Sequence, residues 1–281
     1  MNRIVVAFAA MTALAGVFTA AMAAPSNRTA DKHLLVVTWT TGFRHQDTIG
    51  TPDKDGPAQK IVADIGKSSG VFDVDYCRNQ DDVKKMLTPD GLKKYDAVFF
   101  VNTTGNLGIP DLNAFLDWIK EGHGFIGCHS AADTYHPKDA ENNTGYVDMI
   151  GGEFKTHNRQ CEVTAIVNDT AHPAVSHLGS SAKFFDEIYL YTQNMRDKVH
   201  VLLATDKHPN DGAPDANEPG DYLLSWCKRH GRGRVFYTEL GHKPEVWARE
   251  DYQKHLLGGI KWALGLERGS GRPGNPAAKT P

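Results

Sequence analysis

Side chains that can transfer protons, hold hydroxyl groups or ligate a metal gather at four places in the chain. Each place directly follows an apolar segment. The four groups are Thr40–His45, Asn102–Gly105, His129–Thr134 and Glu239–His242. Together they carry imidazole, guanidinium, amide, hydroxyl and carboxylate groups, which suit acid–base chemistry on a polar substrate. The first hypothesis is therefore one site built from all four groups.

The apolar segments before these groups read as buried β-strands, because they are short and rich in β-branched or aromatic residues. They are His33–Trp39, Ala97–Val101, Gly124–Cys128 and Arg234–Thr238. A further strand is predicted at 71–76, and apolar residues at helical spacing lie between the strands, most clearly over 112–119. This alternation predicts an α/β fold, a parallel sheet with helices on both faces. The four polar groups then meet at the carboxyl edge of the sheet, where ligands bind.

The second half of the chain is richer in strands. The elements predicted there are strands at 161–167, 184–191, 199–205 and 222–228, and a final helix over 244–264. No internal repeat or linker divides the chain, so a single domain over 32–266 is predicted. Residues 267–281 lack an apolar pattern, and we expect them to form a disordered tail.

The segment Gly124–Asp133 has the small residues of a tight strand-to-helix turn of the kind that presents a catalytic nucleophile. The residue at the apex is His129, and Cys128 comes one position too early. A glutamine amidotransferase needs a cysteine at this apex, because a thiolate must attack the amide carbonyl. The pattern therefore excludes that activity and predicts acid–base chemistry or metal ligation by His129.

The chain resembles the ThuA-like family, the trehalose-utilisation group that has a class I glutamine amidotransferase-like fold. The matching stretches are GFRH (42–45), NTTG (102–105), GFIGCHSAADT (124–134), GGEFKTH (151–157), HP (172–173), DEIY (186–189), GRVFYTELGH (233–242) and HLLGGIKWALG (255–265). The resemblance implies a flavodoxin-like parallel sheet with additional strands. It also implies a role in disaccharide metabolism, including chemistry on 3-keto-glycosides. His242 and Glu245 resemble the histidine–glutamate pair of the parent fold, whose cysteine is lost here.

Five residues are assigned catalytic roles on this basis. His129 is the expected central acid/base, and Asp133 is expected to orient it or to bind a hydroxyl group. His157 and His242 are expected to complete proton transfer. Glu187 lies beside apolar residues, which favour a raised pKa and a role as a general acid. The predicted reaction is hydrolysis or proton transfer on a small glycoside or a 3-keto-glycoside.

Other residues are assigned to substrate binding. Arg44 and Asn102 are expected to hold sugar hydroxyl groups or to stabilise developing negative charge. Trp247 either stacks on a sugar face or packs in the core. The remaining candidates are His45, Thr103 and Thr104.

Two alternatives stay open at this level. A metal is the first, because His45, His129, His157 and His242 can converge, and three imidazoles with a water molecule form an open catalytic zinc site. That arrangement predicts a zinc-dependent hydrolase. The second alternative is a sugar-binding protein that uses the same polar pocket without catalysis.

Residues 1–23 read as a cleavable export signal, with Arg3 before a long apolar run and Ala21-Met22-Ala23 as the cleavage site. The expected location is the periplasm or the medium, with no membrane association after cleavage. The formal net charge of −3 and the lack of a Lys/Arg cluster exclude a nucleic-acid-binding role. The predicted partner is thus a small carbohydrate, and the four cysteines are expected to be buried thiols. The sequence does not define the oligomeric state.

Overall fold

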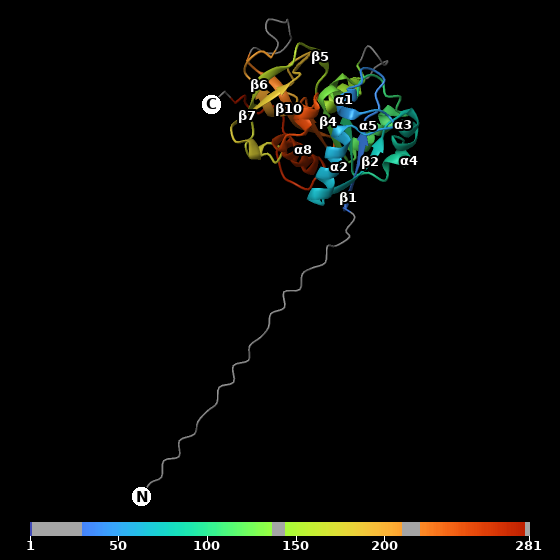
Figure 1. The fold of residues 1–281 in the computed structure, drawn as a ribbon, viewed down its shortest axis with the longest axis horizontal. Helices are drawn as coiled ribbons and strands as arrows, with labels where there is room; N and C mark the ends of the chain where they lie inside the picture. Colours follow the sequence, from blue (N-terminus) through green and yellow to red (C-terminus); the bar gives the residue numbers. More distant parts are fainter. Residues whose placement is uncertain (2–29, 137–143, 210–219, 279–281) are drawn as a thin grey trace.

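A computed structural model describes residues 30–136, 144–209 and 220–278. Nine strands of these residues form one sheet, in the order β2-β1-β3-β4-β11-β10-β9-β6-β7. In Figure 1, β1 and β2 lie toward one side of the molecule and β6 and β7 toward the other. The parallel half contains β2 (Phe72–Cys77), β1 (Lys32–Val37), β3 (Ala97–Val101), β4 (Gly124–Cys128) and β11 (Gly233–Thr238). The antiparallel half contains β10 (Tyr222–His230), β9 (His200–Thr205), β6 (Cys161–Val167) and β7 (Ser181–Asp186). The predicted fold class is confirmed, since the parallel half has the flavodoxin-like strand order.

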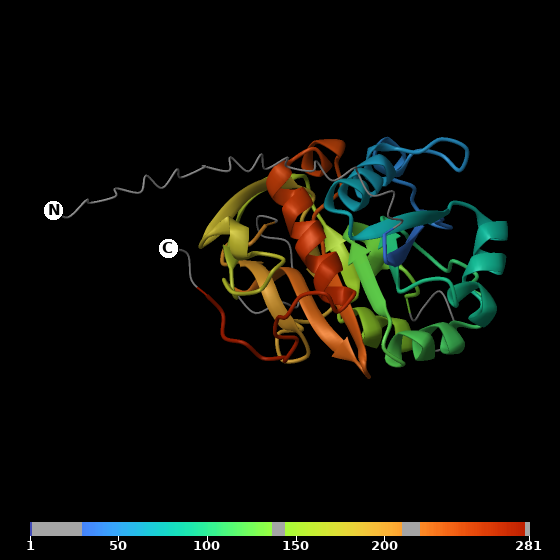
Figure 2. The same cartoon turned by 90° about the horizontal axis from the view of Figure 1, so that it is seen from below.

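Helices cover both faces of the sheet (Figure 2). One face carries α1 (Gln46–Ile49), α2 (Pro57–Ser69), α7 (Pro244–Trp247) and α8 (Glu250–Ala263). The other carries α3 (Gln80–Met86), α4 (Pro89–Leu92), α5 (Leu112–Lys120) and α6 (Thr144–Ile150). Leu34 of β1 packs into the first core and Leu35 into the second, so successive residues of one strand serve opposite faces.

Two predicted elements are divided in the structure. The strand predicted at 184–191 is β7 and then β8 (Tyr189–Tyr191), which pairs with β5 (Phe154–His157) in a separate two-stranded sheet. Asp186 and Glu187 lie where the chain leaves one sheet for the other. The helix predicted over 244–264 is α7 followed by α8, with Arg249 as the extended residue at the start of α8.

Residues 267–278, which belong to the expected disordered tail, form specific contacts in the structure. Residues up to Ala278 are described, and they lie against the antiparallel half of the sheet. Asn275 accepts a hydrogen bond from the backbone N–H of Val201 at 2.8 Å and donates one to the Val201 carbonyl at 2.9 Å. Arg196 donates a further bond to the Asn275 carbonyl at 2.9 Å. Specific polar contacts therefore hold this segment in place. Its order could not be predicted from the sequence, because the segment has no apolar pattern.

The carboxyl ends of β1, β3, β4 and β11 lie at one edge of the sheet. A short 3₁₀ helix, η1 (His129–Asp133), begins directly after β4 and turns the chain sharply there. A second 3₁₀ helix, η2 (Ser176–Leu178), lies in the connection between β6 and β7. The export signal expected at 1–23 falls outside the described residues. Over the described ranges, no helix combines the length and the apolar character needed to span a membrane.

Candidate active site

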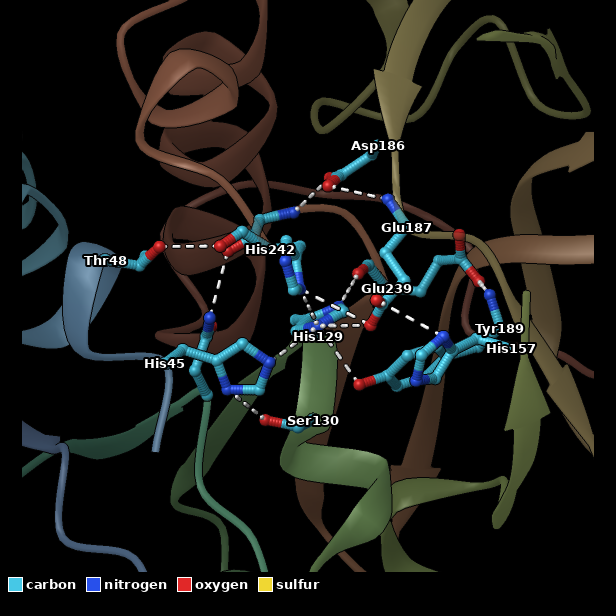
Figure 3. A network of polar contacts seen from close by, with 12 residues as sticks. His45, Thr48, His129, Ser130, His157, Asp186, Glu187, Tyr189, Glu239 and His242 are labelled. Atoms are coloured by element: carbon cyan, nitrogen blue, oxygen red, sulfur yellow. Dashed lines mark hydrogen bonds and ion pairs between the residues drawn. The ribbon is translucent and has the colours of Figure 1, made fainter. Parts of the chain in front are cut away.

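Three imidazoles and one carboxylate converge at the carboxyl edge of the sheet (Figure 3). His45 follows β1, His129 follows β4 and His242 follows β11, so parallel strands deliver all three histidines. Glu187 comes from the connection between β7 and β8. One ligand atom from each of the four side chains lies within 4.8 Å of all the others.

The Nε2 atom of His129 lies at the centre of this group. It is 3.1 Å from Nε2 of His45 and 3.1 Å from Nδ1 of His242. Oε2 of Glu187 lies 3.5 Å from the same nitrogen and 3.3 Å from Nδ1 of His242. In a tetrahedral zinc site with bonds of about 2.0–2.1 Å, neighbouring ligand atoms lie about 3.4 Å apart. The contacts of His129 lie near this spacing and all four ligand atoms are within 4.8 Å of one another, so the four side chains could hold a divalent metal such as zinc.

Two contacts fix the orientation of His129. Its Nδ1 lies 2.9 Å from the backbone carbonyl of Glu239, so this nitrogen carries the proton and donates it to the carbonyl. The lone pair of Nε2 then points into the cluster, as ligation requires. The hydroxyl of Tyr237 donates to the His129 carbonyl at 2.7 Å. These bonds hold His129 at a φ of +46°, a left-handed backbone conformation that is unfavourable for a residue with a Cβ.

Asp186 joins the two loops that carry Glu187 and His242. Its buried carboxylate accepts the backbone N–H of Glu187 at 2.9 Å and that of Gly241 at 2.7 Å. Burial nevertheless raises the pKa of Asp186 above its usual value. The Thr48 hydroxyl donates to the His242 carbonyl at 2.6 Å and holds the same loop from the side of α1.

The electrostatics of the cluster differ from expectation at Glu187. Burial by itself favours a raised pKa, but the nearby imidazoles of His129 and His242 outweigh it and hold the pKa of Glu187 well below its usual value. The predicted raised pKa is therefore wrong, because the sequence did not reveal the imidazoles opposite this carboxylate. Burial, together with nearby His129 and His242, lowers the pKa of His45 to about 2 and keeps that imidazole neutral.

The structure brings together three of the four histidines proposed as metal ligands. His157 is outside the four-residue set, which contains Glu187 in its place. The Nδ1 atom of His157 lies 3.2 Å from Oε1 of Glu187, and its side chain is 41% exposed. His157 is thus a partner of a candidate ligand, because β5 places it at the solvent side of Glu187.

Two cavities meet at His45 and His242. The inner cavity, of about 210 Å³, also contains Asp133 and Glu187 in its wall. The outer cavity, of about 490 Å³, opens beside α1 and α7 and includes Arg44. Glu245 also lines the outer cavity, whereas Glu187 is the carboxylate in contact with His242.

Asp133 faces the inner cavity without orienting His129 as proposed. Its carboxylate makes a short hydrogen bond to Nε2 of His136, and Nδ1 of His136 lies 2.8 Å from Oε1 of Glu153. These contacts raise the pKa of His136, the bond to Asp133 contributing most. The structure therefore gives Asp133 a partner outside the cluster and leaves it in position to accept a hydrogen bond from a ligand.

Three of the proposed substrate-binding residues are buried away from both cavities. Asn102 is fully buried, donates from Nδ2 to the Gly241 carbonyl at 3.0 Å and accepts a bond from Cys128 at 3.2 Å. Thr103 is also fully buried, with its hydroxyl 2.8 Å from that of Thr134. Trp247 is 0% exposed and donates to the Gly241 carbonyl at 2.9 Å, so it packs in the core and cannot stack on a sugar.

Arg44 and Thr104 lie at the cavities but have structural partners. Arg44 donates from Nε to the Gly50 carbonyl at 2.8 Å and from Nη1 to the Thr38 carbonyl at 3.2 Å. Burial lowers the pKa of Arg44 from its usual value. Thr104 lines the inner cavity and donates to the Phe43 carbonyl at 2.9 Å. Both residues therefore shape the loop after β1.

Glu239 lies in one of the four polar groups and Tyr189 in a family motif, but sequence reasoning assigned neither residue a role. The Tyr189 hydroxyl lies 3.0 Å from Nε2 of His129, and burial raises its pKa well above the usual value. Glu239 accepts the Tyr189 backbone N–H at 3.1 Å, and burial raises the pKa of this carboxyl group well above its usual value. An aromatic residue in an apolar strand usually packs in the core. The contact of Tyr189 with His129 could therefore be expected only if the segment 184–191 were known to divide into β7 and β8.

Cys128 is fully buried behind His129 and donates to Asn102. Burial raises the pKa of its thiol far above the usual range. A buried protonated thiol is a poor nucleophile, so the geometry does not support thiol chemistry at this position.

These features define a flavodoxin-like α/β protein with a histidine-rich site at the carboxyl edge of its sheet. The family model for ThuA, trehalose utilisation, matches residues 33–263, and the chain belongs to this family, as its motifs indicated. A putative ThuA-like protein from Bacteroides uniformis has a similar structure, with 23% identity over 86% of this chain and 95% of the other and a TM-score of 0.65.

Two further solved structures share the fold. One is a putative ThuA-like protein from Parabacteroides merdae, with 17% identity over 83% of this chain and 90% of the other and a TM-score of 0.61. The other is a cytoplasmic protein from Salmonella typhimurium, with 14% identity over 83% of this chain and 98% of the other and a TM-score of 0.55. A search of curated proteins found no match.

Proposed function

We propose that this protein is an exported enzyme that acts on a small glycoside or 3-keto-glycoside and binds a divalent metal at its active site. His45, His129, His242 and Glu187 would hold the metal. The observation that carries the proposal is the approach of their ligand atoms to within 4.8 Å of one another. Membership of the trehalose-utilisation family supports a carbohydrate as the substrate.

The arrangement of the cluster argues for a cation at its centre. Unprotonated imidazole nitrogens that face one another at 3.1 Å repel through their lone pairs unless a proton or a cation lies between them. Because Nδ1 of His129 donates its proton to the Glu239 carbonyl, Nε2 carries a lone pair that can ligate a metal. The carboxylate of Glu187 adds a negative charge that favours a bound cation.

The positions of the polar groups around the inner cavity indicate what each could do to a bound sugar. A bound divalent metal supplies Lewis acidity toward a sugar carbonyl or hydroxyl oxygen. The half-exposed His157, 3.2 Å from Glu187, lies at the inner cavity and can carry protons between a ligand and solvent. The Tyr189 hydroxyl can donate a hydrogen bond to a sugar oxygen, and Asp133 can accept one from a sugar hydroxyl.

Export would place this chemistry in the periplasm or the medium. The basic start, the long apolar run and the small residues at 21–23 support a cleavable signal. Mass spectrometry of protein expressed with this segment in a Gram-negative host should find a mature chain that begins near Ala24. A membrane-bound chain that keeps Met1 would contradict export.

Metal analysis of untagged protein tests the proposed centre. We expect about one zinc or comparable divalent ion per chain, lost in His129→Gln, His45→Gln and His242→Gln. His33→Gln, on the far end of β1, is the matched control and should keep the metal. A full metal content in the three cluster variants would contradict the site.

Turnover of trehalose and of its 3-keto form, with and without added metal, tests the activity. His129→Gln should lower turnover by roughly 10²–10⁴-fold, because it removes a ligand that can also transfer protons. Sugar binding without turnover in the wild-type, metal-loaded protein would favour the sugar-binding alternative instead.

A further inference from the structure

Phe43 is an exposed aromatic residue at the entrance of the candidate site. It follows β1, and 68% of its surface is accessible to solvent. It is one of the residues that line both the inner and the outer cavity. An apolar ring left in water forgoes the stabilisation of burial, about 25 cal/mol for each Å². Phe43 therefore contributes little to the stability of the fold, and packing does not account for a large apolar side chain at this position.

The loop that carries Phe43 is held firmly in this position. The Phe43 carbonyl accepts hydrogen bonds from Thr104 at 2.9 Å and from Thr40 at 3.3 Å. The ring packs edge-on against the His45 ring, with centroids 4.9 Å apart and planes at 83°. The neighbouring Gly42 has no room for a side chain, since a Cβ there would lie 2.6 Å from the Thr104 hydroxyl. The exposed ring is thus presented by a constrained loop.

The sizes of the cavities indicate how a ligand would use them. Small-molecule sites usually measure about 300–1,000 Å³, so the inner cavity of about 210 Å³ is too small to hold a whole drug-sized ligand. The outer cavity of about 490 Å³ is large enough for a second unit. A ligand that reaches the cluster from the inner cavity would therefore extend past Phe43 into the outer one.

The outer cavity has the chemistry of a carbohydrate subsite. Its wall carries acidic, basic and amide side chains, namely Asp47, Glu245, Lys243 and Gln46. A wall that carries both positive and negative side chains, with hydrogen-bond donors and acceptors, suits a neutral ligand with many hydroxyl groups better than a strongly charged ligand. The ring of Phe43 adds the apolar surface that the C–H face of a sugar ring can cover.

We infer that the outer cavity is a second subsite, which binds the sugar ring or aglycone beyond the reacting unit, with Phe43 as its stacking platform. This inference rests on the proposed carbohydrate substrate. It identifies a disaccharide or a larger glycoside, rather than a monosaccharide, as the preferred ligand. Phe43 determines this preference without touching the reacting atoms.

Calorimetric titration of the mature, metal-loaded protein with trehalose and with D-glucose tests the subsite. The wild-type protein should bind trehalose more tightly than glucose. Phe43→Ala should weaken trehalose binding by roughly 3- to 10-fold, the usual effect of one stacked aromatic contact, and leave glucose binding unchanged. Phe43→Trp keeps an aromatic platform and should retain the preference. Phe185→Ala is the matched control, because Phe185 is 55% exposed and lines neither of the two cavities.

The outcomes separate this inference from the proposed function. Equal affinities for the two sugars, unchanged in Phe43→Ala, would overturn the second subsite and leave the carbohydrate substrate standing. An equal loss of affinity for both sugars in Phe43→Ala would place Phe43 at the reacting unit and would also overturn the second subsite. Failure of the wild-type protein to bind either sugar would overturn the carbohydrate substrate and the subsite together. Unchanged metal content and circular dichroism in Phe43→Ala would show that the variant is folded.

Discussion

Nε2 of His129 and Nε2 of His45 face each other at 3.1 Å, although the two residues lie 84 positions apart in the sequence. His129 directly follows β4, and His45 lies in the loop that leads from the end of β1 at Val37 into α1. Because β3 alone separates these strands in the sheet, their carboxyl ends deliver the two rings to one point. The parallel topology itself therefore brings the two rings together.

Asp186 should influence metal binding without being a ligand. Its carboxylate holds the loops of Glu187 and His242 through two backbone N–H groups. Asp186→Asn keeps the shape but replaces one acceptor oxygen by a donor, so we expect zinc affinity to fall by about 10–100-fold. Competition with a chelator measures this change. Asp81→Asn, on an exposed side chain, is the control, and equal affinity in the two variants would contradict the positioning role.

Cys128 should be unreactive in the folded protein. It has no exposed surface, and burial raises the pKa of its thiol. Iodoacetamide should modify Cys128 only after denaturation, and Cys128→Ala should keep turnover within about 2–3-fold of the wild type, because the thiol contacts no reacting atom. Peptide mass spectrometry measures the labelling. An adduct of a glutamine analogue on Cys128 of the native protein would argue for the amidotransferase chemistry that we exclude.

His136 should make the stability of the protein depend on pH. Hydrogen bonds to Asp133 and Glu153 raise its pKa above the usual 6.5. A pKa raised in the folded state stabilises the protein fully below the unfolded-state pKa, and this stabilisation is lost as the pH rises through the folded-state pKa. His136→Gln should therefore lower the free energy of unfolding by about 1–2 kcal/mol near pH 6 and by less near pH 9.

Urea unfolding of the wild-type and His136→Gln proteins at several pH values checks this expectation. The comparison reports on His136 together with Asp133 and Glu153, the two carboxylates that it contacts, because all other titrating groups keep the same neighbours in both proteins. A difference in unfolding free energy that grew with rising pH would have the wrong sign and would refute a charged His136.

Trp247 should contribute to stability and not to sugar recognition. It is fully buried, and its indole N–H bonds the Gly241 carbonyl. Trp247→Ala should lower the free energy of unfolding by about 3–5 kcal/mol, the usual cost of removing a buried tryptophan. Trp247→Phe should recover part of this loss. Normal stability with selective loss of trehalose binding would instead support the stacking role that the sequence left open.

The parallel core and the strands that deliver the histidines can be predicted from local sequence patterns. Short apolar segments alternate with helical patterns, and polar residues follow each segment directly. A parallel sheet places all such strand ends at one edge, so these patterns are enough to predict that His45, His129 and His242 meet. The family motifs, GFRH and GCHSAADT among them, lie at these same strand ends.

Three features of the site depend instead on contacts between distant parts of the chain: Glu187 completes the cluster, its pKa is lowered, and Trp247 is buried. Glu187 lies where the chain passes from β7 to β8, and long-range antiparallel pairing with β6 and β5 sets that position. A local pattern shows how far apart residues are along a strand but not which distant strand will pair with it. The charge state of a carboxylate depends in turn on the imidazoles opposite it, which come from remote parts of the chain.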